Sequence, residues 1–494
     1  MLTTDEIRKF LDEDQGSLLK QAAKVGQRYY DGEHDILAYR MFYYNAEGQL
    51  VEDKYRSNIK IPHPFFTELV DQGTQFVLSG AEDGIIRSDD TKLQQQLDIY
   101  FNKNKKFMVE LSETITGQQA KGFDYMYAYK GKHDRLEFEN ADCLGVVEVE
   151  GRFTKDKKDQ RIYRYMDRVD KDGNFQWKIL VIDDESTHYY KQTNDGKIEK
   201  DDSVELNPRP HVLYKKNGKL FTKKNAKHFL PFFRLDMNKK RVSLLKPVKP
   251  LIDDYDLMAS SLSNNLVDFD TPIHVVRGFE GDNLDEIQRN VKTKKLIGVD
   301  EEGGVDIKTV DVPYQARVAK LEQDEKSIYR FGMGLNMSGL KDTAATTNIA
   351  IKAAYSLLDM RSKKIVDQLE LFLQQIVEVV LAEINEHEGT AYTMEQVWFN
   401  FKPDIISNAQ ENAQIELTEA QKQQTVINTV LGLADRLDNE TMMQMICEQL
   451  DIEYEEIKSK LPNPDEALDD LGGAAATLGG VVTDPEPAGG GVVE

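Results

Sequence analysis

The segment Phe331-Gly-Met-Gly-Leu-Asn-Met-Ser-Gly-Leu-Lys-Asp-Thr-Ala-Ala-Thr-Thr-Asn348 is rich in glycine and small residues and runs into the strongest helical pattern of the chain. Glycine adopts backbone conformations closed to other residues, which favours a mobile loop here. A helix over residues 348–386 would be roughly 58 Å long at 1.5 Å per residue, which predicts a spine crossing the whole subunit. Its apolar residues recur at intervals of three, four and seven positions: Leu358, Ile365, Leu369, Phe372, Ile376, Val380 and Ile384.

Two further helical patterns precede this loop and bracket a small insert. The first covers residues 251–269, after a stretch broken by prolines, with an apolar stripe that includes Leu266. The second covers residues 314–331 and leads directly into the loop. The insert is expected to be rich in short strands, with strand-like runs at residues 273–277, 295–299 and 305–310 and a small helix over 284–291. The order of these elements predicts a protrusion carried on a two-helix stalk.

Helices are also expected at both ends of the chain. Thr3 and Glu6 form a capping-box pattern at the start of the first one, in which each side chain satisfies a backbone N–H of the other. Apolar periodicity predicts further helices over residues 67–79, 91–121 and 408–460. The last residues, 471–494, consist mostly of Asp, Gly, Ala, Pro and Val and are expected to be disordered, because they carry too little apolar surface to offset the entropy of ordering.

The period changes from helix to strand at Phe123. From Phe123 to Tyr129 aromatic residues alternate with other types, which predicts a strand with one buried face. Asp-Gly turns then separate several more strand-like runs, which favours an antiparallel meander up to about Phe233. These runs cover residues 146–150, 161–169, 175–182 and 187–192.

Composition and charge exclude several classes of protein. The formal net charge is −23, which excludes a conventional basic DNA-coating protein. Only Cys143 and Cys447 are present, so a disulfide framework is excluded and a reducing cytoplasm fits best. No signal-peptide pattern and no apolar stretch of membrane-spanning length is present, which indicates a soluble intracellular protein.

The charge is distributed unevenly along the chain. Residues 207–250 carry 13 Lys and Arg and one acidic residue, a net of +12, whereas residues 387–494 carry 21 acidic and 5 basic residues, a net of −16. Mixed solvated surfaces explain part of this pattern. The alternative is an elongated subunit whose ends meet different partners.

No sequence motif indicates an active site. Gly332-Met-Gly334 with Gly339 has the wrong spacing for a dinucleotide-binding loop, and no βαβ pattern accompanies it. The histidines are scattered, which argues against a zinc constellation. Asp183-Asp-Glu185 and Asp253-Asp254 could bind a divalent ion through carboxylate oxygens, but solvated charge is the simpler interpretation.

The sequence resembles the portal proteins of tailed bacteriophages, of the siphophage type. The likeness is clearest in Arg28-Tyr-Tyr-Asp-Gly-Glu-His-Asp-Ile36, in Asn58-Ile-Lys-Ile-Pro-His-Pro-Phe-Phe-Thr-Glu-Leu-Val-Asp71, and in Leu78-Ser-Gly80. It returns in residues 344–361, where the Gly-rich loop enters the long helix, and it covers roughly residues 20–460. These short motifs are not signatures of a chemical mechanism. The resemblance therefore rests on the order in which the structural parts follow one another along the chain.

The resemblance implies an α+β, mainly helical, ring-forming fold. Its expected parts are a wing of mixed α/β structure, a two-helix stem, a small β-containing clip, a tunnel loop, a long spine helix, a helical crown and a disordered tail. In this chain they would cover residues 1–245 (wing), 246–269 and 314–331 (stem), 270–313 (clip), 332–347 (tunnel loop), 348–386 (spine), 387–462 (crown) and 463–494 (tail).

The resemblance also implies a function without catalysis or cofactor. About twelve subunits would form a ring at one capsid vertex, through which double-stranded DNA enters during packaging and leaves at infection, without sequence specificity. The clip would meet the terminase large subunit and later the head-completion (adaptor) proteins, and the wing would meet the major capsid and scaffolding proteins. The protein would be assembled in the host cytoplasm and belong to the virion, with no membrane contact.

Candidate contact residues follow from these parts. In the tunnel loop they are Leu335, Asn336, Met337 and Lys341, which would touch passing DNA; in the clip they are Arg277, Lys292, Lys294 and Lys295, which would serve docking. An acidic channel fits this function, because each Lys or Arg that neutralises a phosphate adds affinity and therefore friction. Plain solvation of Lys341 and an ordinary helix–helix connector remain alternatives for the loop.

Two other functions fit the same residues. One is another oligomeric virion connector, although such proteins are usually much shorter than 494 residues. The other is a nucleic-acid-processing enzyme that uses the basic residues 215–249 as a binding surface. The size of the particle distinguishes a portal from such an enzyme, because a portal forms a ring of several hundred kilodaltons, whereas the enzyme is expected to be a monomer or dimer.

Overall fold

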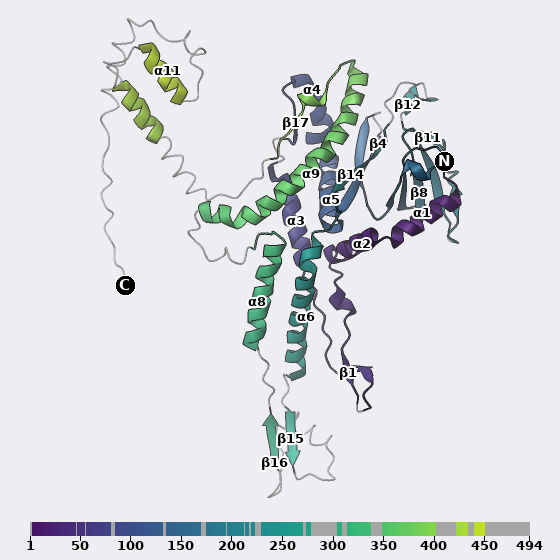
Figure 1. Ribbon diagram of the computed structural model, residues 1–494, viewed down its shortest axis with the longest axis vertical. Helices are drawn as coiled ribbons and strands as arrows, with labels where there is room; N and C mark the ends of the chain where they lie inside the picture. The colour runs from purple at the N-terminus through teal and green to yellow at the C-terminus, as the bar shows by residue number, and fades with distance from the viewer. Residues whose placement is uncertain are drawn as a thin grey trace. The chain divides into compact units, whose positions relative to one another are not determined.

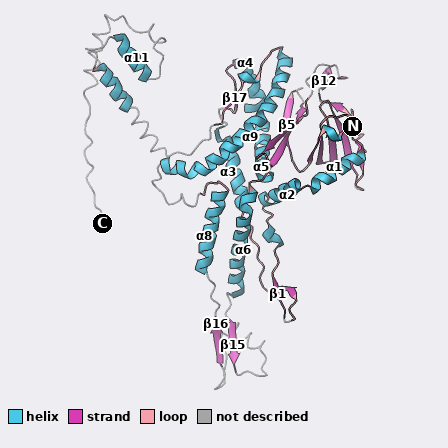
Figure 2. Cartoon of the chain, in the orientation of Figure 1, coloured by secondary structure: helices cyan, strands magenta, loops and turns pink. Residues whose placement is uncertain are grey.

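The computed structural model describes residues 2–45, 47–54, 56–80, 84–131, 135–168, 174–193, 195–211, 213–216, 219–222, 229–269, 273–277, 304–308, 314–336, 348–401, 421–432 and 439–449. The chain divides into two compact units, one of Met1–Ala344 with Lys352–Ile405 and one of Ala345–Ile351 with Ile406–Glu494. Helices and strands are mixed along the first unit (Figure 2). Within the described residues, no helix is both long enough and apolar enough to span a membrane.

The first unit begins with helices (Figure 1). The capping box of Thr3 and Glu6 is confirmed at the start of α1. The expected continuous helix over residues 91–121 is wrong, because a π-helical turn at Asp98–Asn102 ends α4 and Asn104 caps a new helix through its side chain. The helices are α1 (Thr4–Gly16), α2 (Leu18–Tyr30), η1 (Asp35–Ala38), α3 (Phe65–Leu78), α4 (Thr91–Leu97) and α5 (Lys105–Lys121).

The expected single meander is divided between two sheets. One has the strand order β14–β4–β5, and the other has the order β10–β9–β8–β7–β6, with β11 pairing β9. All printed strand pairs in both sheets are antiparallel. The strands are β4 (Phe123–Lys130), β5 (Leu136–Ala141), β6 (Val146–Val149), β7 (Gln160–Arg168), β8 (Phe175–Ile182), β9 (Ser186–Gln192), β10 (Ile198–Lys200), β11 (Arg209–Pro210) and β14 (Phe232–Asp236).

Strand β4 is buried on both faces at its start, so the expectation of one buried face is wrong. Met126 and Ala128 belong to a large core shared with α5 and the long helix α9 (Asn348–Glu388). Phe123 and Tyr125 instead pack in a second core with residues of the six-stranded sheet. The side chains of β4 do alternate between two faces, but other elements cover both of these faces.

The long helix expected over residues 348–386 is confirmed as α9, which ends two residues later at Glu388. Gly389 follows with φ +69°, a left-handed conformation that commonly ends helices at glycine. The apolar face of α9 is almost fully buried, with Ile365, Leu369 and Ile376 at 0% exposure. The helix therefore supplies one side of the main core.

Two helices flank the expected insert. The first, α6 (Leu245–Phe269), begins earlier than the prolines suggested: Pro247 lies in its first turn and Pro250 inside it. The second, α8 (Tyr314–Phe331), has the expected bounds. Between them, β15 (Ile273–Arg277) pairs antiparallel with β16 (Gly304–Lys308). The expected helix over 284–291 and strand over 295–299 lie outside the described residues.

The remaining elements are short. β1 (Phe42–Tyr44) pairs β2 (Leu50–Glu52), β12 (Leu213–Lys216) pairs β13 (Lys219–Thr222), and β17 (Trp398–Phe399) pairs β3 (Ile86–Arg87). Single turns of 3-10 helix lie at η4 (Gly151–Phe153) and η6 (Met394–Gln396). In the second unit, residues 421–431 are helical and α11 covers Asn439–Gln449, which confirms helix within part of the range 408–460.

Candidate functional site

Helices α6 and α8 lie side by side and form the centre of the candidate site (Figure 1). The Lys320 ammonium of α8 forms ion pairs with Asp254 of α6 and with Asp324 one turn further along α8. At the other end of α8, Tyr329 donates a hydrogen bond of 2.5 Å to Glu68 of α3. The helix pair is therefore fixed to α3 at the end where α8 leads into residue 332.

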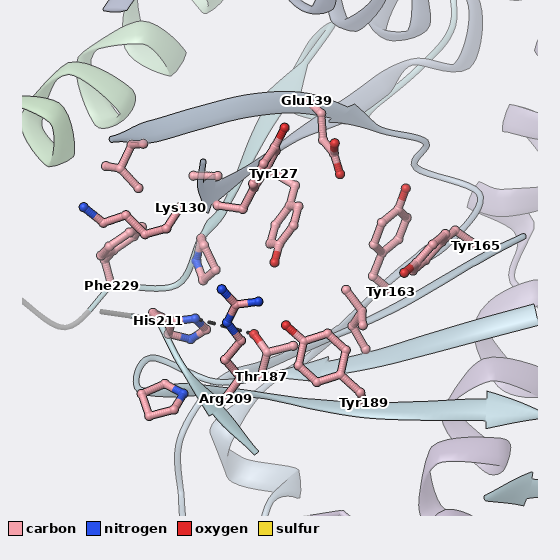
Figure 3. A pocket seen from close by; sticks show the side chains of 16 residues that line it. Tyr127, Lys130, Glu139, Tyr163, Tyr165, Thr187, Tyr189, Arg209, His211 and Phe229 are labelled. Atoms are coloured by element: carbon pink, nitrogen blue, oxygen red, sulfur yellow. Dashed lines mark hydrogen bonds between the residues drawn. The ribbon is translucent and has the colours of Figure 1, made fainter. Parts of the chain in front are cut away.

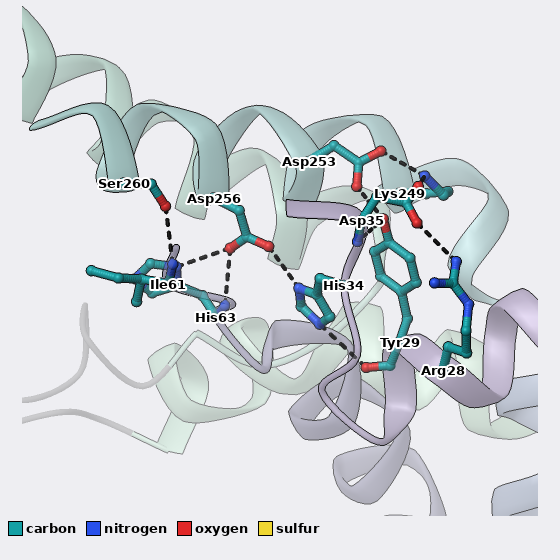
Figure 4. A network of polar contacts seen from close by, with 10 residues as sticks. All are labelled: Arg28, Tyr29, His34, Asp35, Ile61, His63, Lys249, Asp253, Asp256 and Ser260. Atoms are coloured by element: carbon teal, nitrogen blue, oxygen red, sulfur yellow. Dashed lines mark hydrogen bonds and ion pairs between the residues drawn. The ribbon is translucent and has the colours of Figure 1, made fainter. Parts of the chain in front are cut away.

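An extended segment, residues 57–63, runs along α6 and is bonded to it at every second residue; Figure 4 shows the bonds from Ile61 and His63. We call this segment the strap. Two extended residues advance about 6.6 Å and four helical residues about 6 Å, so alternate strap N–H groups meet side chains four apart on the helix. The pairs and their donor–acceptor distances are Ser57 with Asp268 (3.0 Å), Ile59 with Asn264 (2.6 Å), Ile61 with Ser260 (3.1 Å) and His63 with Asp256 (2.9 Å).

Asp256 is the most heavily bonded of these side chains. Its carboxylate is 0% exposed and accepts from the Nδ1 atoms of His34 at 2.6 Å and His63 at 2.9 Å. Burial alone would raise the pKa of Asp256, but the hydrogen bonds from the two histidines outweigh it and hold the pKa below its ordinary value. A buried carboxylate with several donors is thus kept ionised where α6, the strap and the end of α2 meet.

A second polar cluster joins the start of α6 to the end of α2 (Figure 4). Lys249 donates to Asp35 at 2.6 Å and to Asp253 at 2.7 Å, and the Tyr29 hydroxyl also donates to Asp253. Burial and the hydrogen bond to Asp253 raise the pKa of Tyr29, so its hydroxyl keeps its proton. Asp253 and Asp254 are thus engaged by lysines, which accounts for this acidic pair without a metal ion.

Residues 332–336 leave α8 in a tightly packed conformation. A Cβ added to Gly332 or Gly334 would lie 2.5 Å or 2.3 Å from side-chain atoms of Leu69 on α3, so both positions exclude larger residues. The Gln72 side-chain amide both accepts from Leu335 N–H and donates to Leu335 O, each at 2.9 Å. Gly332 and Gly334 therefore serve close packing, whereas Gly339 and the rest of the loop, whose mobility stays a prediction, lie outside the described residues.

Arg361 of α9 also contacts the start of this segment, and it contacts α3 as well. Its guanidinium is fully buried and donates to Gly332 O at 2.9 Å and to Leu69 O at 2.7 Å. Burial lowers the pKa of Arg361 to about 10, which still leaves it charged at neutral pH. Because Nη1 and Nη2 bond main-chain carbonyls of two different segments, Arg361 connects α3, α9 and the end of α8.

The structure describes only some of the predicted contact residues. Leu335 is 6% exposed and supports the junction, and Asn336 donates from Nδ2 to Glu325 at 3.2 Å. Whether either touches DNA stays a prediction. Arg277 lies in β15, and the other predicted residues, Met337, Lys341, Lys292, Lys294 and Lys295, lie outside the described residues.

Sequence reasoning missed the strap and its helical partners. The apolar stripe that we assigned to α6 includes Leu266, which is 52% exposed, whereas the buried face carries Asp256, Ser260 and Asn264. Polar residues do recur every four positions from 256 to 268, but other polar residues in the same stretch, among them Ser261 and Asn265, obscure this pattern. Arg361 gave no signal, since a single arginine on a helix is ordinarily exposed.

One group of candidate metal ligands occurs in the described part of the chain, formed by Asp124, Asp142 and Cys143. Lys121 lies between the two carboxylates, with Nζ 3.0 Å from Asp124 and 2.8 Å from Asp142. Burial, followed by the charge of Asp124, raises the pKa of Cys143, which disfavours the thiolate that a metal would need. The residues fit a buried ion pair better than a metal site.

A cavity of about 370 Å³ lies where the two large sheets face each other (Figure 3). Its walls are rich in tyrosine, and Figure 3 shows Tyr127, Tyr163 and Tyr189 directed into it from different strands. His211 is held by Asp183 O at 2.7 Å and Thr187 Oγ1 at 3.5 Å. The 3.5 Å between Thr187 Oγ1 and His211 Nδ1 is longer than the roughly 2.6–3.2 Å at which a base activates a hydroxyl.

Comparisons with known proteins agree on one family. Residues 13–458 match the family described as phage portal protein, SPP1 Gp6-like. The portal protein of Bacillus phage SPP1 is 28% identical over 382 residues, which cover 75% of this chain and 71% of that protein. The portal protein of Clostridium phage phiCD119 is 26% identical over 157 residues, 31% of this chain and 35% of that protein.

Among solved structures, a chain from the neck of a native GTA particle, computed with C12 symmetry, aligns with 77% of this chain and 90% of its own length. Its TM-score of 0.34 at 12% identity is too low to establish a shared fold. The family match stands without it, because it spans far more than half of the chain. The chain therefore belongs to the SPP1 Gp6-like family of phage portal proteins.

Proposed function

We propose that this chain forms a ring of twelve copies at one vertex of a phage capsid. Double-stranded DNA passes through the central channel during packaging and leaves by the same path at infection. The observation that carries this proposal is the family match over residues 13–458. The portal names of two relatives from different phages support it.

Each part of the chain has a proposed role in this ring. The wing covers residues 1–245, the stem residues 246–269 and 314–331, and the clip residues 270–313. The tunnel loop, the spine helix and the crown cover residues 332–347, 348–386 and 387–462, and a tail follows at 463–494. The helix pair α6 and α8 around a β-strand pair supports the order stem, clip, stem.

The proposed partners meet different parts. The clip docks the terminase large subunit during packaging and the head-completion proteins afterwards, with Arg277, Lys292, Lys294 and Lys295 as candidate contacts. The wing faces the major capsid and scaffolding proteins. The protein is a virion component that assembles in the host cytoplasm, and no catalytic step is assigned to it.

The proposed DNA contacts lie in the tunnel loop. Leu335 is buried and bonded to Gln72, and Asn336 is bonded to Glu325, which favours a role for these two residues in supporting the start of the loop. The direct contacts are then Met337 and Lys341. An overall charge of −23 per copy fits a channel that repels DNA and keeps friction low, because few cations neutralise phosphates.

Particle size and shape test the ring directly. Twelve copies of 56.5 kDa amount to about 680 kDa. We expect light scattering to give a mass near this value and negative-stain images to show rings with a central opening. A stable monomer at micromolar concentration would contradict the proposal.

The role in DNA passage needs a separate test with assembled rings. Lys341→Ala should leave ring assembly intact and shorten the DNA packaged per capsid, because it removes a contact by which the loop is proposed to grip passing DNA. Lys9→Ala in α1 is a matched control, since it removes an exposed lysine far from the tunnel loop in sequence. Normal genome length in both variants would remove Lys341 from the proposal and leave the ring itself untouched.

A further inference from the structure

The hairpin formed by β1 and β2 exposes apolar side chains on both of its faces. Phe42, Tyr44 and Leu50 are 53%, 73% and 59% exposed, and Tyr43 and Val51 point to the other side at 42% and 37%. Among the described residues, the two strands pair only with each other. An isolated two-stranded hairpin is at best marginally stable in water, and contiguous exposed apolar surface marks an interaction site.

The hairpin is nevertheless held in a defined place, at the C-terminal end of α6. Arg56, just after the hairpin, bonds Asn265 at 3.1 Å and Asp268 at 3.4 Å, and Ser57 N–H donates to Asp268. The two legs of the hairpin are also tied together, because Lys60 donates to Leu37 O at 2.8 Å. A rigidly mounted apolar projection fits a permanent contact.

The strap and α8 lie on opposite flanks of α6. The strap bonds Asp256, whereas Asp254, which pairs with Lys320 of α8, lies two residues earlier and so about 200° around the helix. Each copy therefore has the hairpin on one flank of α6 and α8 on the other. A ring joins one flank of each copy to the opposite flank of the next, as a head-to-tail interface requires.

The beginning of α8 offers a surface that suits the hairpin. Tyr314 is 57% exposed, and Ala316 and Ala319 are exposed as well, so this end presents small and apolar side chains next to the exposed Gln315. Further along α8 the exposed residues become charged, with Glu322 and Lys326. Small residues let a partner's aromatic rings approach the helix backbone closely.

Position along the ring axis points to the same pairing. α8 runs back along α6 from the insert, and its pair Lys320–Asp254 puts its first turns beside the C-terminal half of α6, within about 10 Å along that helix of Asn265, where the hairpin is bonded. Rotation about a ring axis keeps the height of every atom, so these two surfaces of adjacent copies lie at similar levels. The partner is thus a second copy of this chain.

We propose that the β1–β2 hairpin of one copy packs on the first turns of α8 of the next copy and joins the ring there. This inference rests on the proposed ring. Its energetic centre is the exposed pair Tyr44 and Leu50, because aromatic and aliphatic anchors carry much of the binding energy of an interface. The strap fixes the hairpin in advance, so little ordering entropy is lost on assembly.

The first test weakens the hairpin without touching the strap. Tyr44→Ser with Leu50→Ser should make ring dissociation, measured by sedimentation as a function of concentration, about tenfold or more easier. Phe153→Ser, a residue of comparable exposure at 60%, is the control and should leave dissociation unchanged. Thermal unfolding of the dissociated chain should be similar in all three proteins, which shows that the fold itself is kept.

The second test identifies the contacted surface. Tyr44→Cys with Ala316→Cys in one chain, treated with a short bismaleimide, should give a ladder of multiples of 56.5 kDa on a denaturing gel. Each single variant should give no ladder, because Cys143 and Cys447 are buried. Rings that form normally but cross-link only within one chain, or that tolerate the serine variant, overturn this inference. A wild-type protein that forms no ring contradicts the proposed function instead.

Discussion

Helices α6 and α9 are both long, but different forces hold them in place. From Ile365 onward the buried face of α9 is apolar apart from Glu383, with Ile365, Leu369 and Phe372 at 0–1% exposure in the main core. The buried face of α6 beyond Ile252 is polar and carries Asp256, Ser260 and Asn264, each bonded to the strap. Apolar packing is non-directional, whereas a series of hydrogen bonds is satisfied in a single register.

This difference assigns different tasks to the two helices. α9 contributes buried area and therefore much of the stability of the first unit. We call the series of hydrogen bonds between the strap and α6 the ladder. Each of its bonds contributes less free energy than a buried apolar side chain, but together they fix the position of the strap, and with it that of the hairpin. A shift of the strap by one residue along α6 would break every bond of the ladder at once, much as a register slip does in a sheet.

The largest effect is expected in the core around α9. Phe372→Ala should lower the free energy of unfolding by about 3–5 kcal/mol, because it removes a buried ring and leaves a cavity. Leu371→Ala is a matched control on the adjacent residue, which is 56% exposed, and should change stability by less than about 0.5 kcal/mol. Urea denaturation followed by circular dichroism measures both, and equal losses would contradict the assignment of the buried face.

Asp256→Asn should have the next largest effect. Asparagine keeps an acceptor for the strap but loses the charge that pairs with His34 and His63, so we expect a loss of about 2–3 kcal/mol. Asp254→Asn removes an acid of the same helix whose ion pair with Lys320 is solvent-exposed, and it should cost at most about 1 kcal/mol. The same denaturation experiment distinguishes them, and similar losses would show that the buried carboxylate has no special role.

The positions of several helices and strands could be predicted from the sequence, and the reason is periodicity. α8 and β8 have the bounds expected for residues 314–331 and 175–182, because their periods of 3.6 and 2 are local properties. The strap could not be predicted in this way, since Ile59 and Asn264 are 205 residues apart and no local pattern connects them. The break before Lys105 was missed because the apolar spacing continues across it.

The candidate site was predictable only in outline. Gly332 and Gly334 were recognised as special, but the sequence could not distinguish mobility from close packing against Leu69. Arg361 illustrates the same limit, because a buried arginine bonded to two carbonyls depends on segments brought together by the fold. Contacts of this kind are tertiary, and a single sequence contains no trace of them.

Within the ladder, the number of bonds should determine the size of the effect. Asn264→Ala removes two hydrogen bonds to Ile59 and should cost about 1–3 kcal/mol, whereas Ser260→Ala removes one and should cost about 0.5–1.5 kcal/mol. Protection of strap amides from hydrogen exchange should fall in both variants and leave α9 unchanged. Loss of protection spread evenly over both helices would mean that the strap unfolds only with the whole unit.

The smallest effect is expected from pH. The folded pKa of Asp256 lies below its ordinary value of 3.8, because the hydrogen bonds from His34 and His63 outweigh its burial. The stability that this carboxylate contributes is therefore complete above about pH 4–5 and is lost as the pH falls from 3.8 through the lower folded pKa. In unfolding curves measured from pH 7 down to pH 3, wild type and Asp256→Asn should differ most at the upper end and converge towards the lower end. A difference that stays constant over this range would mean that the neutral acid serves the ladder as well as the carboxylate does, and that hydrogen-bond geometry, rather than charge, holds α6 to the strap.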